Sequence, residues 1–152
     1  MKFLLIAPFL FACNDAVLEE TGDGLLRLAS ITGTIELGVT PSDDGRGTML
    51  VILSIVSNDP EIIPHRVFVE PVIDFGLDGT TATFELTNIF PQEQPYHLGA
   101  FLDEDFSMPY QDDLSATSGD ITSWGKSGVF DEIVLGSGEQ KTMTLILDTV
   151  TE

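Results

Sequence analysis

Residues 48–56 read TMLVILSIV, an almost unbroken run of aliphatic and β-branched side chains. β-branched residues favour strands, and a run without polar alternation is typical of a strand that is covered on both faces. A dense turn signal lies before it in residues 41–45, PSDDG, and Asn58-Asp59-Pro60 closes it. We therefore expect residues 48–56 to form a central strand.

The segments around this run alternate between apolar and polar residues with a period of two, which marks strands with one buried and one solvated face. Such segments are residues 31–39, 80–86, 96–102 and 141–148, and we also expect strand over residues 66–70 and 72–75. Pro71 either interrupts one strand or separates two short edge pieces. Asp78-Gly79 predicts a hairpin turn before residues 80–86. About seven strands, with no helical periodicity, predict an all-β fold: a single antiparallel β-sandwich with Greek-key connections.

Charge excludes two classes of partner. The chain has 152 residues, with 6 Lys and Arg against 25 Asp and Glu, and a net charge of -19. Phosphate binding needs a basic surface, so we expect no nucleic acid as a partner. Electrostatic docking on anionic lipid is excluded for the same reason.

The first residues have the layout of a secretory signal peptide. Lys2 supplies a positive charge, and an apolar run follows over residues 3–12. This run is too short to span a bilayer, which takes about 20 residues in a helix. Cys13 is the only cysteine, so an intramolecular disulfide is excluded. Two alternatives stay open: a secreted chain that is cut elsewhere, and a buried N-terminal strand with a core cysteine.

The run ends in Leu10-Phe11-Ala12-Cys13, which resembles the lipobox of bacterial lipoproteins. The resemblance implies that Cys13 is lipidated and that the chain is exported and anchored to the bacterial cell envelope, at the outer membrane or the cell surface. The membrane is then a partner through the N-terminal lipid. The implied division is a signal peptide over 1–12, a lipidated acidic tether over 13–24 and a β-sandwich domain over 25–152.

The predicted strands resemble an immunoglobulin-like sandwich of the prealbumin-like, or carboxypeptidase-regulatory-like, subclass. The resemblance rests on Gly33-Thr34-Ile35, on residues 50–55, on Phe84-x-Leu86 and on the alternating residues 96–105. It implies that Tyr96 is a corner tyrosine whose hydroxyl is bonded to a nearby backbone group. It implies no particular activity, since this fold has many unrelated functions.

One cluster of side chains is a candidate metal site. Acidic residues are concentrated after the strand predicted at 96–102: Asp103, Glu104, Asp105, Asp112, Asp113 and Asp120. In an extended segment, Asp103 and Asp105 point the same way and repel each other unless a cation lies between them. Ca²⁺ takes six to eight oxygen ligands, so we predict Ca²⁺ as a cofactor held by the five aspartates. The alternative is a solvated acidic surface without an ion.

Other candidate side chains are few. His65 and His97 are the only histidines, without zinc-site spacing, and strand parity places His97 on an outer, exposed face. Tyr110 and Trp124 lie in predicted loops, where aromatic rings can bind a sugar or a protein partner. Alternatively, Trp124 caps one end of the core. We expect Arg66 to pair with a nearby carboxylate.

Three functional hypotheses follow. The first is a non-enzymatic, envelope-anchored lipoprotein, a β-sandwich binding or structural module ordered by calcium, whose partner is an envelope protein or glycan. The second is a carbohydrate- or peptide-binding accessory module that uses the loop aromatics. The third, which the small size of the chain disfavours, is a hydrolase with paired carboxylates.

Overall fold

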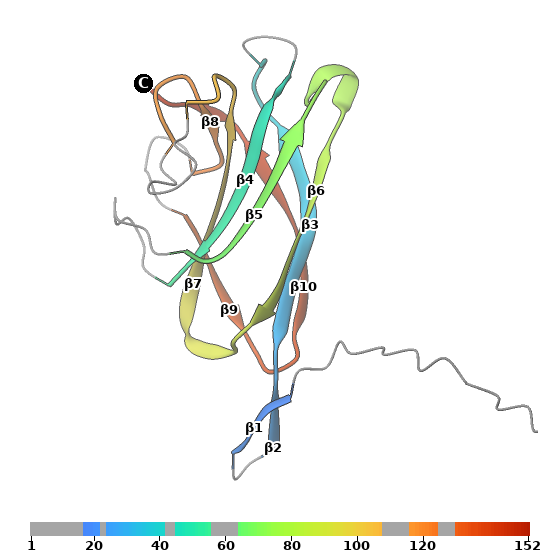
Figure 1. The fold of residues 1–152 in the computed structure, drawn as a ribbon, viewed down its shortest axis with the longest axis vertical. Coiled ribbons are helices and arrows are strands. Elements are labelled where there is room, and N and C mark those ends of the chain that lie inside the picture. Colours follow the sequence, from blue (N-terminus) through green and yellow to red (C-terminus); the bar gives the residue numbers. More distant parts are fainter. Residues whose placement is uncertain (1–16, 22–23, 42–44, 56–63, 108–115, 125–129) are drawn as a thin grey trace, which may run out of the picture.

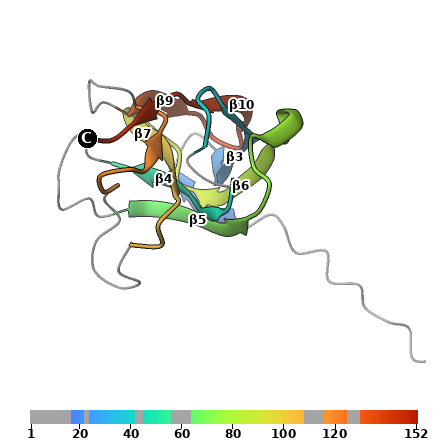
Figure 2. The same ribbon diagram turned by 90° about the horizontal axis from the view of Figure 1, so that it is seen from above.

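The computed structural model describes residues 17–21, 24–41, 45–55, 64–107, 116–124 and 130–152. Two sheets pack face to face as a β-sandwich, which confirms the predicted fold class (Figure 1). Seen from above, the strands surround a common core, with β5 and β10 on opposite sides (Figure 2).

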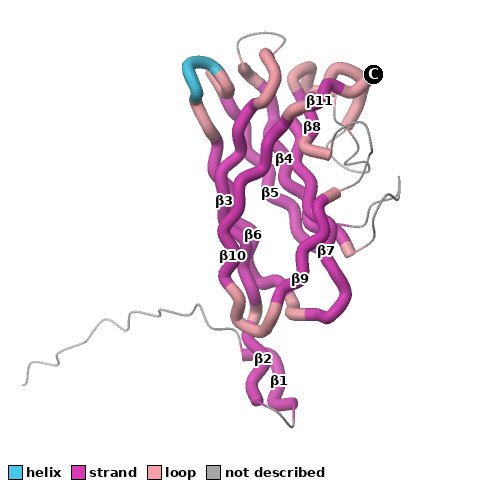
Figure 3. The backbone as a smooth tube through the Cα atoms, turned by 180° about the vertical axis from the view of Figure 1, so that it is seen from behind, coloured by secondary structure: helices cyan, strands magenta, loops and turns pink. Residues whose placement is uncertain are grey.

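The smaller sheet has the strand order β10-β3-β6. β3 (Ala29–Leu37) lies in the middle, between β6 (Ala82–Ile89) and β10 (Gln140–Leu147). The alternating sequences of these three strands place apolar side chains inward, as predicted: Ile31, Ile35, Phe84, Leu86, Leu145 and Leu147. One pair departs from the antiparallel expectation, because β10 runs parallel to β3. β9 belongs to the larger sheet, so the chain crosses between sheets before β10, and β10 then runs beside β3 in Figure 3.

The larger sheet has the order β11-β8-β7-β4-β5, and β9 also pairs with β7. Its members are β4 (Gly47–Ser54), β5 (Pro64–Val72), β7 (Gln92–Asp103), β8 (Ile121–Thr122), β9 (Asp131–Leu135) and β11 (Thr149–Val150). β4 is central, as predicted, and every residue of it except Thr48 is buried. The β4 sequence does not alternate between apolar and polar residues because both faces of the strand are covered. Met49 and Val51 face the main core, while Leu50 and Ile52 belong to a second apolar cluster.

A two-stranded hairpin, β1 (Val17–Thr21) and β2 (Gly24–Arg27), projects from one end of the sandwich, and β2 leads into β3 (Figures 1 and 3). β1 falls within the segment predicted as a tether. Cys13 and the predicted signal peptide lie outside the described residues.

The connection from β5 to β6 differs from the predicted hairpin. β5 is one continuous strand through Pro71 and pairs with β4, whereas β6 pairs with β3 in the other sheet. The chain crosses between them through a 3-10 turn, η1 (Leu77–Gly79), with Asp78 at φ 54. Asp78-Gly79 therefore turns the chain, but it joins two sheets instead of two neighbouring strands.

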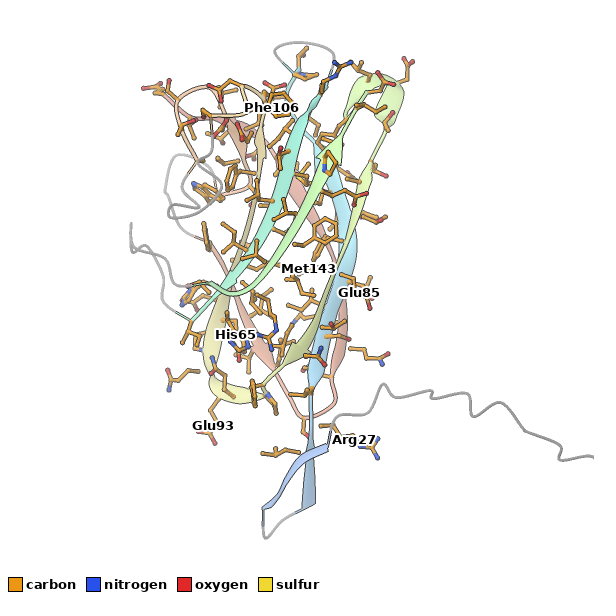
Figure 4. All side chains as sticks on the ribbon, viewed as in Figure 1. Arg27, His65, Glu85, Glu93, Phe106 and Met143 are labelled. Atoms are coloured by element: carbon orange, nitrogen blue, oxygen red, sulfur yellow. The ribbon has the colours of Figure 1, made fainter. Side chains whose placement is uncertain are left out.

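Two side chains hold together the end of the sandwich from which the β1–β2 hairpin projects, where His65 and Glu93 are labelled in Figure 4. The buried Tyr96 hydroxyl donates a hydrogen bond to the Phe90 carbonyl at 2.7 Å, which confirms the bond expected of a corner tyrosine. The Arg66 guanidinium on β5 donates to the carbonyls of Thr87, at 3.1 Å, and Asn88 on β6. Arg66 thus links the two sheets where their last strands meet.

Candidate metal centre

The pairing of β7 with β8 explains why two distant aspartates meet. The antiparallel register sets Phe101 opposite Thr122 and Leu102 opposite Ile121. The next residues in the two directions are Asp103, the last residue of β7, and Asp120, which precedes β8.

Three of the five predicted metal ligands lie together. Asp103, Asp105 and Asp120 each offer one carboxylate oxygen, and these oxygens are all within 4.8 Å of one another. Asp103 and Asp120 are each only 2% exposed, whereas Asp105 is open to solvent. The neighbouring Phe106, labelled in Figure 4, marks this end of the sandwich, opposite the β1–β2 hairpin. We call these three residues the acidic triad.

Each of the three triad carboxylates accepts a hydrogen bond from a backbone N–H. The Ser107 N–H donates to Asp103 Oδ1 at 3.1 Å and to Asp105 Oδ1 at 2.8 Å. Phe106 has a φ of 56, and this turn brings the Ser107 amide back towards both carboxylates. Asp120 Oδ2 accepts from the backbone N–H of Thr117 at 2.6 Å and from its hydroxyl at 3.2 Å. Asp120 Oδ1 is buried and has no hydrogen-bond partner among the residues that the structure describes.

The electrostatics of the triad follow from this geometry. Burial raises the pKa of Asp120, and the nearby Asp103 and Asp105 carboxylates raise it further, against the hydrogen bonds from Thr117. The pKa of Asp105 is lowered, because Ser107 donates hydrogen bonds to the ionised carboxylate. A buried carboxylate oxygen without a partner is costly, and a cation removes that cost.

The triad could therefore hold a metal ion. Two oxygens bound to one Ca²⁺ at about 2.4 Å can lie no more than about 4.8 Å apart, so the observed limit of 4.8 Å fits a shared ion. Carboxylate oxygens are also ligands that Mg²⁺ and Mn²⁺ accept, so the geometry alone does not select the metal.

The other predicted site residues have different outcomes. Asp112, Asp113 and Tyr110 lie outside the described residues. Trp124 is half-buried, with its ring centroid 4.8 Å from that of Phe130 and 5.9 Å from that of Phe101, so it covers the second apolar cluster. A ligand-binding role for Trp124 stays a prediction.

The prediction of an exposed His97 is wrong. His97 is 7% exposed, and its face of β7 is covered: a Cβ atom on Gly99, which lies two residues further on the same face, would be 2.7 Å from the Phe130 ring. Strand parity identifies the face of a sheet but not what covers that face. The hydrogen bonds of Arg66 within the described part of the chain go to backbone carbonyls, where we expected a carboxylate.

Comparison of the chain with protein-family models, with curated proteins and with solved structures finds no match. In the part of the chain that the structure describes, no helix has both the length and the apolar character needed to cross a bilayer.

Proposed function

We propose that this chain is a non-catalytic, lipid-anchored module of the bacterial cell envelope. In this proposal the β-sandwich binds or supports another envelope component, and a calcium ion orders the end of the sandwich that carries the acidic triad. The observation that carries the proposal is the triad itself: three carboxylates lie together, and the buried Asp120 has one oxygen, Oδ1, without a hydrogen-bond partner among the described residues.

Calcium suits the triad better than magnesium does. Mg²⁺ demands nearly ideal octahedral geometry at about 2.0–2.1 Å and keeps several waters. Ca²⁺ accepts six to eight oxygens at about 2.3–2.6 Å in irregular arrangements. Two triad residues are buried and one is exposed, so protein oxygens would fill one side of the ion and water the other.

An ion at the triad would connect three segments of the chain. Asp103 ends β7, Asp105 belongs to the following loop, and Asp120 begins the approach to β8. The segment around Asp120 is also bonded to the C-terminal residues, because the Thr151 N–H donates to the Asp120 carbonyl at 2.8 Å and the Gly119 N–H donates to the Thr151 carbonyl at 3.0 Å. The ion would therefore fix these segments relative to one another at one end of the sandwich, which is a structural role that suits a binding module.

The anchor is supported by the sequence around Cys13 and by the direction of the chain. The β1–β2 hairpin, which follows Cys13, and the acidic triad lie at opposite ends of the sandwich (Figure 1). A lipid on Cys13 would therefore direct the triad away from the membrane. The net charge of -19 favours the same orientation, because anionic headgroups repel an acidic domain.

Metabolic labelling tests the anchor. The full chain is expressed in a Gram-negative host that is fed radiolabelled palmitate, next to the matched variant Cys13→Ser. We expect label on the unsubstituted chain, which partitions into detergent, and neither property in the variant. An unlabelled chain in the aqueous phase, or label that survives Cys13→Ser, would contradict the anchor.

A further inference from the structure

A groove lies on the side of the sandwich where β5, the last strand of the larger sheet, faces β6, the last strand of the smaller one. Its volume is about 540 Å³, and its apolar lining comes from four strands: Gly33, Phe68, Phe84 and Met143. A second hollow of about 290 Å³ continues towards η1, and the two share Glu70 and Thr83 in their linings. Met143 and Glu85, labelled in Figure 4, locate the groove.

The floor of the groove explains why it is open. A Cβ atom on Gly33 would lie 2.7 Å from the Phe84 ring, so the ring rests directly on the glycine backbone. Gly33 has no side chain to occupy this part of the groove, and both Gly33 and the buried Phe84 line it. Phe68 and Met143, both partly buried, border that space and offer it apolar surface.

The two strands that border the groove have unpaired edges. Among the described residues, β5 pairs only with β4 and β6 pairs only with β3. No backbone–backbone hydrogen bond joins β5 to β6 in that part of the chain, and the Arg66 side chain bridges them at one end. Unpaired strand edges are templates for a further extended segment.

The charge at the groove selects the occupant. Glu70 and Glu85 are both exposed and line the groove, and among the described residues no lysine or arginine does. An acidic groove with an apolar floor complements a strand that alternates apolar and basic side chains. The volume of about 540 Å³ falls within the range of about 300–1,000 Å³ that is usual for ligand sites.

We propose that this groove binds an extended segment of another polypeptide by strand addition. The backbone of that segment pairs with the free edge of β5 or β6, its apolar side chains enter the hollow between Phe68, Phe84 and Met143, and its basic side chains pair with Glu70 and Glu85. The inference rests on the proposed role as a binding module, and it identifies the partner as a basic, extended peptide.

A direct binding assay tests the proposal. The probe is a fluorescein-labelled peptide of about eight residues that alternates valine and lysine, with a valine–glutamate peptide as its control. The protein is the full chain with Cys13→Ser, compared with Glu70→Lys/Glu85→Lys and with the matched control Asp131→Lys/Glu132→Lys, at two exposed residues of β9. We expect saturable binding that the groove variant weakens roughly tenfold or more and that the control pair leaves nearly unchanged. Amide NMR shifts should map to β5, β6 and β3.

Several outcomes would overturn the proposal. They are no saturable binding at millimolar peptide, equal weakening by the two charge-reversal pairs, and shifts outside these strands. The proposal would also be overturned if the chain self-associates and Glu70→Lys/Glu85→Lys abolishes this self-association, because the groove would then bind a second copy of the chain. Thermal melts of each variant establish that it folds. Palmitate labelling at Cys13 and calcium binding at the triad do not depend on the groove, so failure here is distinguishable from failure of the proposed function.

Discussion

Neutralising Asp120 should have opposite effects on stability with and without calcium. Asp120→Asn keeps the size of the side chain and retains an oxygen that accepts from Thr117. It places an amide N–H₂ at the position of Oδ1, which has no partner among the described residues, and so brings a hydrogen-bond donor into the triad. Without a metal, the substitution therefore replaces repulsion with a hydrogen bond.

The size of the effect follows from the distances. Two unit charges within 4.8 Å of each other repel by about 3.5 kcal/mol or more at an effective dielectric constant of about 20. Asp105 is exposed, so solvent and salt screen its share, and we expect a net gain of about 1–2 kcal/mol in the unfolding free energy. For a chain of this length, that corresponds to a rise of about 3–6 °C in Tm in EDTA.

With calcium the order should reverse. A ligand at a hundred times its Kd stabilises the folded state by about 2.7 kcal/mol, and the Asp120→Asn substitution removes a charged ligand from the ion. The assay is a thermal melt of the full chain with Cys13→Ser, in EDTA and in millimolar Ca²⁺, with Asp131→Asn as the matched loss of one exposed carboxylate. A destabilisation by Asp120→Asn that is the same in both buffers would refute the reasoning, because the triad would then act as a hydrogen-bonding unit without a cation.

The remaining predictions concern pH and two structural bonds. The pKa of Asp120 is raised in the folded chain, so the folded state binds a proton more readily than the unfolded state does. The metal-free chain should therefore gain stability as pH falls from 7 towards 3.8, the usual pKa of an aspartate. Denaturant unfolding at each pH should show that this gain is smaller in Asp120→Asn. Tyr96→Phe removes the donor to the Phe90 carbonyl and should cost about 1 kcal/mol in urea unfolding, with no change in calcium affinity. Arg66→Lys replaces the planar guanidinium with a single ammonium, which cannot reach the Thr87 and Asn88 carbonyls together. The substitution should therefore lower the midpoint of urea unfolding. An unchanged midpoint would mean that Arg66 does not hold the sheets together.

The fold was largely predictable because its signals are local. Period-two alternation identified β3, β6 and β10, and the unbroken aliphatic run identified β4 as a strand covered on both faces. The parallel β3–β10 pair and the crossing from β5 to β6 were not predictable, since they depend on which sheet each strand joins. A turn signal such as Asp78-Gly79 fixes a change of direction and leaves the destination open.

The candidate site was predictable in part. All three triad residues were among the five aspartates predicted as ligands. The alternation of the strand accounts for Asp103 and Asp105, whereas the approach of Asp120 depends on the register between β7 and β8. The contribution of Ser107 and Thr117 as backbone donors has no signal in the sequence, because any residue other than proline has an N–H in those turns. The groove between β5 and β6 likewise arises from the packing of Phe84 on Gly33 across two strands.

Isothermal titration of the metal-free full chain, carrying Cys13→Ser, with Ca²⁺ and separately with Mg²⁺ tests the calcium centre most directly. We predict one saturable Ca²⁺ site that is selective over Mg²⁺ and is lost in Asp103→Asn/Asp105→Asn, while Asp131→Asn retains it. Equal, unsaturated heats for the two ions, or a calcium site that survives substitution of both triad aspartates, would contradict a metal centre at the acidic triad.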